Sequence, residues 1–96
     1  MDERLAKQWA VIEQLLREAA VQVQLTPYFA EFEDFLGHNE LEIALDTLAA
    51  AGEECSVSPE YWRLLKQAAD VMGLKAKAAE FRHKRRAARA KNSEPT

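Results

Sequence analysis

Apolar residues recur along this chain every three or four positions, the spacing that places them on one side of an α-helix. The pattern is clearest near the amino-terminal end, where it predicts a helix over about residues 3–24. Such a stripe is buried only against other packed elements, so the spacing favours a bundle of helices. The residues of this first stripe are Leu5, Trp9, Ile12, Leu16, Ala19 and Val23.

Further helices are predicted by the same spacing, each bounded by residues that commonly start or stop a helix. Thr26-Pro27 and Ser58-Pro59 combine a cap residue with a proline at the first helical position, where its missing N–H costs nothing. Trp62 and Phe81, like Trp9, fall on apolar stripes and are assigned to the core. The predicted helices cover about residues 27–36, 40–51, 59–72 and 74–91.

The ends of these helices are predicted from three glycines and one asparagine. Gly37, Gly52 and Gly73 are each expected to end a helix, and Gly37 to do so in the left-handed conformation that glycine adopts without steric cost. Asn39 and Glu42 have the spacing of a capping box, in which both side chains accept hydrogen bonds from unpaired backbone N–H groups. The second and third helices are therefore predicted to form a tight helical hairpin.

The predicted fold is all-α: a compact bundle of four to five short helices joined by tight loops, with a basic helix at the carboxyl end. No alternating apolar and polar run predicts a strand, and 96 residues suffice for one core only. Residues 1–91 are assigned to a single helical domain and residues 92–96 to a disordered end. Because Cys55 is the only cysteine and no signal or membrane-spanning segment is evident, a cytoplasmic location is expected.

Charge is distributed unevenly along the chain, although the formal net charge is only −3. Residues 1–60 contain thirteen Asp and Glu against three Lys and Arg, whereas residues 61–96 contain three against ten. Such a separation indicates charged partners, pairing between the two halves of the chain, or both. Self-association of the oppositely charged halves into a homodimer is a further alternative.

Few residues are available for catalysis. The chain has two histidines, one cysteine and three serines, and Ser58 already serves as a predicted helix cap. Asp34, His38 and Glu42 have a spacing that would suit a metal site on a continuous helix, but a predicted turn interrupts that helix. No phosphate-binding loop, dinucleotide-binding pattern or paired-cysteine motif is present. We therefore expect no enzymatic activity, no metal and no cofactor.

An acidic cluster on the predicted hairpin is the main candidate for a binding site. Because the apolar stripes point elsewhere, most of these carboxylates are expected to face solvent, where they can attract a basic partner protein. Any exposed part of Tyr28 or Tyr61 is expected to add an apolar anchor. The alternative is a solvated surface that only keeps the chain soluble. The predicted partner-binding residues are Glu31, Asp34, Glu40, Glu42 and Asp46.

The basic segment near the carboxyl end is a second candidate. Lys and Arg on a helix can neutralise phosphates, so a nucleic-acid-associated accessory protein is the alternative function. No aromatic residue is interleaved for base stacking, and the same cations can instead pair with the acidic hairpin. The candidate nucleic-acid-binding residues are Arg82, Lys84, Arg85, Arg86, Arg89 and Lys91.

Two stretches of the chain resemble small all-helical bacterial immunity-type proteins, which are encoded beside secreted or contact-dependent toxins. They are LGHNELEIALDTL, residues 36–48, and SPEYWRLLKQAADVMGL, residues 58–74. The resemblance implies a non-catalytic inhibitor that covers a cognate toxin with an exposed acidic surface, but it does not account for the basic tail. A weaker similarity links Gly37, Ala44 and Leu45 to a tetratricopeptide repeat, although 96 residues hold at most two such repeats.

Overall fold

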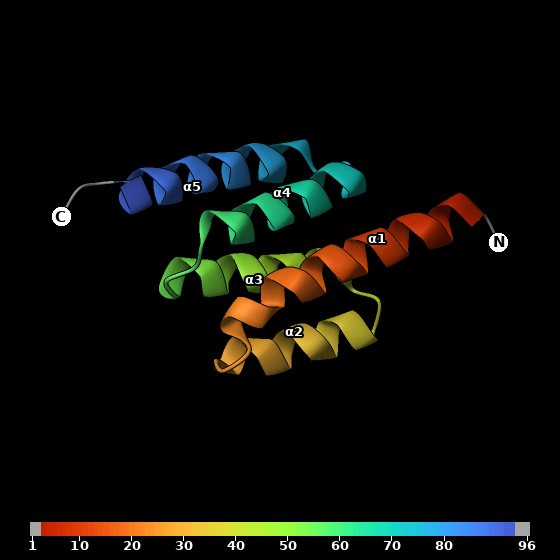
Figure 1. Cartoon of the computed structure of the whole chain (residues 1–96). Coiled ribbons are helices and arrows are strands. Elements are labelled where there is room, and N and C mark those ends of the chain that lie inside the picture. Colours follow the sequence, from red (N-terminus) through yellow and green to blue (C-terminus); the bar gives the residue numbers. More distant parts are fainter. Residues whose placement is uncertain (1–2, 94–96) are drawn as a thin grey trace.

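The computed structural model describes residues 3–93, which form five α-helices and one turn of 3-10 helix (Figure 1). The predicted all-α bundle is confirmed. The first predicted helix changes to a 3-10 turn after Ala20, and the last helix runs two residues into the segment expected to be disordered; residues 94–96 lie outside the described residues. The elements are α1 (Glu3–Ala20), η1 (Val21–Val23), α2 (Pro27–Gly37), α3 (Leu41–Glu54), α4 (Pro59–Met72) and α5 (Lys75–Ser93).

Successive helices run in opposite directions and stack in the order α5, α4, then α1 and α3 together, then α2 (Figure 1). α4 packs against α5 on one side and against α1 and α3 on the other, while α2 packs mainly on α3. The chain thus forms two helical hairpins, α2–α3 and α4–α5, with α1 lying against both. This order places α2 and α5 on opposite sides of the molecule.

The predicted apolar stripes meet in one core. Trp62 extends this core toward α5, where its ring stacks on that of Phe81 with 6.0 Å between the ring centroids. The ring of Tyr61 meets Trp62 edge-on at 5.4 Å, an arrangement that aromatic pairs favour. α5 is therefore attached through an aromatic contact. The largest fully buried side chains of the core are Tyr61, Phe32, Leu16, Leu45, Leu48, Leu65 and Val23.

Trp9 is not part of the core, contrary to the prediction. It lies on the same helical stripe as Ile12 and Leu16, which are buried, but 48% of its surface is exposed. The amino-terminal end of α1 extends past the neighbouring helices (Figure 1). Helical spacing reports which side of α1 is apolar, but a stripe is buried only where another helix covers it.

The turn between α2 and α3 uses Asn39, not Gly37, in the left-handed conformation. Asn39 has φ 58°, and its N–H and that of Glu40 donate to the carbonyls of Leu36 and Phe35 at 3.0 and 2.9 Å. This bond pair defines a Schellman end, in which asparagine can replace glycine. The predicted capping box is therefore wrong, since Asn39 ends α2 and Glu40 occupies the cap position of α3 without a side-chain cap bond.

Gly52 does not end a helix, because α3 continues to Glu54. A Cβ at this position would lie 2.7 Å from Cε1 of Tyr61 and 2.8 Å from two ring atoms of Trp62. Gly52 thus allows the first turn of α4 to approach the backbone of α3. Gly73 does end α4 as predicted, with φ 76° and a bond from the Leu74 N–H to the Ala69 carbonyl at 2.9 Å.

The two predicted cap residues lie at the expected positions but make other hydrogen bonds. Thr26 Oγ1 donates to the Val23 carbonyl at 2.7 Å and so closes the turn that follows η1. Ser58 Oγ accepts from Gln22 Nε2 at 2.7 Å, and the Ser58 N–H donates to Gln22 Oε1 at 2.8 Å. One glutamine side chain therefore fastens the start of α4 to η1.

We expect the fold to lose stability at alkaline pH through Tyr61. Its buried hydroxyl donates to the Leu48 carbonyl, and burial raises the pKa of Tyr61 above its ordinary value of 10. The neutral phenol favours folding up to about pH 10, and this contribution is lost as the pH rises further, since the unfolded chain ionises first.

Urea unfolding between about pH 8 and 11.5 should therefore show a midpoint that falls above about pH 10. In the Tyr61→Phe variant the urea midpoint should fall less above pH 10. At neutral pH this variant should be less stable than the wild type, because it lacks the hydrogen bond to the Leu48 carbonyl. Tyr28→Phe is the comparison variant: Glu54 also raises the pKa of Tyr28, but this tyrosine is only half-buried, so its removal should flatten the decline less than Tyr61→Phe does. Equal alkaline loss in the wild type and in Tyr61→Phe would contradict this account.

Candidate protein-interaction surface

The α2–α3 hairpin is acidic throughout. It carries eight Asp and Glu residues, all exposed, and no Lys or Arg. The nearest Lys or Arg along the sequence are Arg17 and Arg63. Any neutralisation of this hairpin within the chain must therefore come from another helix.

α5 neutralises the side of α3 that faces it. Lys77 pairs with Asp46 and lies 3.7 Å from Glu42, and Lys84 pairs with Glu53. The hydrogen bond to Asp46 raises the pKa of Lys77. Lys77 and Lys84 are seven residues apart, as are Asp46 and Glu53, so two turns of α5 match two turns of α3. These ion pairs link α5 to α3, although α5 packs mainly on α4.

The outer face of α2 keeps its negative charge. Glu31, Glu33 and Asp34 are exposed on this helix, on the side of the stack opposite to α5. Within residues 6–91, whose side chains are described, no Lys or Arg forms an ion pair with them. His38 Nδ1 donates to the backbone carbonyl of Asp34 at 2.7 Å. This hydrogen bond, together with the negative charge of the Asp34 carboxylate, raises the pKa of His38.

The five predicted partner-binding residues therefore do not form one surface. Glu31 and Asp34 lie on the outer face of α2 and Glu40 lies in the turn that follows, whereas Glu42 and Asp46 face Lys77. Glu33 belongs with the α2 group. We call Glu31, Glu33, Asp34 and Glu40 the α2 acidic face.

The tyrosines expected to anchor a partner differ in exposure. Tyr61 is fully buried and cannot contact a partner. Tyr28 is half-buried beside Glu54, whose hydrogen bond raises the pKa of the phenol. Phe29 and Phe35 of α2 are also half-buried. Apolar contact area next to the α2 acidic face is therefore available from α2 and from the exposed Leu25 just before it.

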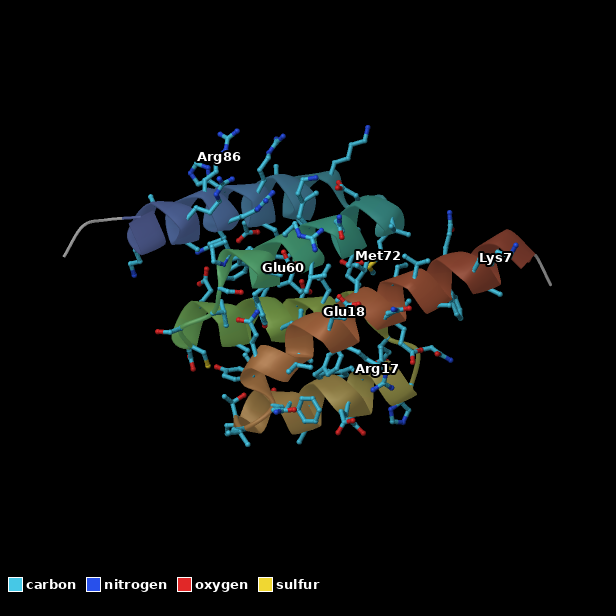
Figure 2. The ribbon with its side chains drawn as sticks, in the orientation of Figure 1. Lys7, Arg17, Glu18, Glu60, Met72 and Arg86 are labelled. Carbon is cyan, nitrogen blue, oxygen red and sulfur yellow. The ribbon has the colours of Figure 1, made fainter. Side chains whose placement is uncertain are left out.

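The candidate nucleic-acid-binding residues of α5 also divide. Lys84 pairs with α3, while Arg82 and Arg86 are exposed, and Arg86 points away from the helix stack (Figure 2). Arg85 is half-buried and close enough to Glu60 to help lower the pKa of that carboxyl, which Arg63 lowers more strongly. The exposed arginines thus lie on a different side of α5 from the paired lysines.

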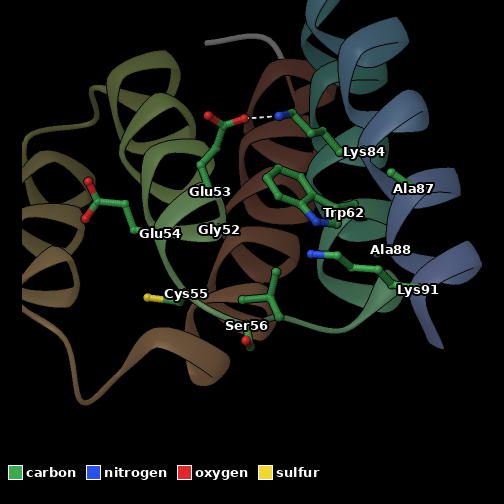
Figure 3. A pocket seen from close by; sticks show the side chains of 11 residues that line it. Gly52, Glu53, Glu54, Cys55, Ser56, Trp62, Lys84, Ala87, Ala88 and Lys91 are labelled. Atoms are coloured by element: carbon green, nitrogen blue, oxygen red, sulfur yellow. Dashed lines mark ion pairs between the residues drawn. The ribbon is translucent and has the colours of Figure 1, made fainter. Parts of the chain in front are cut away.

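A groove of about 420 Å³ separates the carboxyl-terminal ends of α3 and α5, with Trp62 between them (Figure 3). The Glu53–Lys84 pair bridges it, and Lys91 reaches into it from α5 (Figure 3). Its lining also includes Glu54 and the half-buried Cys55. The two carboxylates and two ammonium groups of the lining cancel in charge. The groove therefore has no net charge that would favour binding of a cation or an anion.

The candidate metal-binding and nucleophilic residues can be placed in the structure. Within residues 3–93, no group of three or more His, Cys, Asp or Glu is placed to hold a metal ion. Ser58, the serine nearest to a helix start, is bonded to Gln22 and not to a histidine.

None of the described helices is both long and apolar enough to cross a membrane.

No protein-family model matches this chain, and no curated protein or solved structure is significantly similar to it. The resemblances to immunity-type proteins and to tetratricopeptide repeats therefore remain expectations. What can be proposed about function must come from the charged surfaces.

Proposed function

We propose that this chain is a cytoplasmic, non-catalytic protein-binding module that inhibits a basic partner protein by covering it, as immunity-type proteins do with toxins. The observation that supports this most is the imbalance within the acidic hairpin. Lys77 and Lys84 of α5 pair with carboxylates of α3, whereas none of the ion pairs seen within residues 6–91 joins a Lys or Arg to the α2 acidic face, so its carboxylates remain available to a partner. A protein that needed only solubility would not require this one-sided arrangement.

The shape of α2 suits contact with a protein surface. Eleven residues give this helix a length of about 16 Å. Pro27, Ala30 and Gly37 are exposed on it, and these small side chains let a partner approach closely. The half-buried Tyr28 and Phe35 can supply apolar contact at the edge of the charged area.

The proposed mechanism has two steps. Uncompensated carboxylates attract Lys and Arg of the partner over several ångströms and so raise the association rate. Close contact of α2 then excludes substrate or solvent from the covered surface of the partner. The second step requires no reactive group in this chain.

Charge reversal on α2 tests this function. Wild-type protein and Glu31→Lys/Asp34→Lys would be immobilised and used to capture partners from lysate of the native organism, with nuclease added. We expect the wild type to retain a basic protein in near-stoichiometric amount and the α2 variant to lose it by at least about tenfold, because two attractive contacts become repulsive.

The matched control is Glu13→Lys/Glu80→Lys, which changes the net charge equally at exposed positions on α1 and α5. Circular dichroism verifies that each variant is folded. The proposal fails if the control and the α2 variant lose the captured protein to the same extent, or if the α2 variant retains it fully.

A further inference from the structure

The basic side chains of α5 lie on two different sides of the helix. Lys77 and Lys84 face the carboxylates of α3. At 100° per residue, Lys75, Arg82 and Arg86 lie within about 40° of one another on another side of the helix. All three are exposed. We call Lys75, Arg82 and Arg86 the α5 basic face.

The α5 basic face is not used for internal ion pairs. Within residues 6–91, no described carboxylate forms an ion pair with Lys75, Arg82 or Arg86. The one acidic residue among the described side chains of α5, Glu80, lines a small cavity together with Glu53 and Lys84. It therefore lies on the side of α5 that faces α3. Among the described carboxylates, none neutralises the positive charge of Lys75, Arg82 and Arg86.

The chemistry of this face favours phosphate over other anions. Arginine presents a planar fork of donors that matches phosphate oxygens, and an exposed ridge of such groups can follow a charged backbone. The exposed residues beside it are alanines, His83 and Arg89, without a large apolar side chain. Insertion into a membrane surface normally requires such side chains, and binding of single strands normally uses aromatic stacking.

The acidic part of the molecule does not prevent this contact. α4 and the layer of α1 and α3 lie between α5 and α2 (Figure 1). Helix axes pack about 8–10 Å apart, so the α2 acidic face lies roughly 25 Å from α5. Screening in physiological salt acts over about 8 Å, which leaves little repulsion at that distance.

We propose that the α5 basic face binds the phosphodiester backbone of duplex nucleic acid without reading its sequence. This surface is separate from the α2 acidic face, so the two proposals can succeed or fail independently. Because phosphate contacts alone carry no sequence information, unrelated duplexes should bind equally. Three contacts should give weak binding that depends strongly on salt.

Fluorescence anisotropy of the full chain with labelled duplexes of about 20 base pairs, two turns of DNA, tests the proposal. Two unrelated DNA sequences and one RNA duplex serve as probes, and vesicles containing phosphatidylserine serve as the competing anionic surface. For three phosphate contacts, the binding constant should fall about 40-fold between 50 and 200 mM salt. Arg82→Gln/Arg86→Gln should weaken binding at least tenfold and reduce the slope of log K against log salt by about two.

Lys7→Gln/Arg17→Gln removes the same charge from exposed positions on α1 and should change affinity by less than about twofold. Arg82→Lys/Arg86→Lys should restore most of the salt dependence, because charge is retained. Three results would each overturn the proposal: no duplex binding at low salt, equal losses in the α1 and α5 variants, or binding to the vesicles but not to the duplexes.

Discussion

Trp62→Ala should lower the free energy of unfolding by about 3–5 kcal/mol, the usual cost of deleting a large buried aromatic side chain. Trp62 is 5% exposed and contacts the rings of both Tyr61 and Phe81. Its removal leaves a cavity among three helices and detaches α5 from its main aromatic contact. Urea unfolding followed by far-UV circular dichroism measures the loss.

Trp9→Ala is the matched control, because it deletes the same side chain from the half-exposed end of α1. We expect it to cost about 0.5 kcal/mol. Each variant keeps one tryptophan, so the emission of Trp62 alone should lie at shorter wavelength than that of Trp9 alone. Similar stability losses in the two variants would show that the assigned core is wrong.

Gly52→Ala should destabilise the protein by about 1–3 kcal/mol, the range for overpacking a close contact. In an exposed helix interior the same change is stabilising by about 1 kcal/mol, because alanine favours the helix. Here the added Cβ would lie 2.7 Å from a ring carbon of Tyr61. The sign of the effect therefore reports how closely α3 and α4 approach.

Gly37→Ala is the control for this prediction. Gly37 is the last residue of α2, and a Cβ there would have no neighbouring atom within 4 Å. We expect this variant to be unchanged or slightly more stable in the same urea experiment. A Gly52→Ala protein that is also more stable would rule out the close packing of α4 on α3.

Sequence patterns predicted the helices well and the contacts between them less well. The stripe through Ile12 and Leu16 is buried, and the signals at Pro27, Pro59 and Gly73 mark real helix ends. These signals act within one turn of helix, so they can be read locally.

Predictions that depended on another helix were less accurate. The sequence predicts a helix end at Gly52, since the contact with Tyr61 that explains this glycine comes from another helix, α4. The apolar stripe predicts a buried Trp9, but helical spacing does not show where the covering helix ends. Asn39 and Gly37 could both have ended α2, and only the bonds to Leu36 and Phe35 distinguish them.

The candidate sites show the same division. Composition alone located the acidic hairpin and the basic helix. It could not show that Lys77 and Lys84 neutralise α3, because this depends on how α4 holds α5 relative to α3. The equal spacing of the two lysines and of Asp46 and Glu53 was the available signal. With these pairs removed from the predicted sites, one acidic face and one basic face remain, on opposite sides of the stack.

Amide hydrogen exchange, with and without the basic protein recovered by capture, tests the central claim that the α2 acidic face is the partner-binding surface. Our account predicts slower exchange within residues 27–40 of the bound chain and little change along α5. Protection centred on α5, or none within α2, would contradict it.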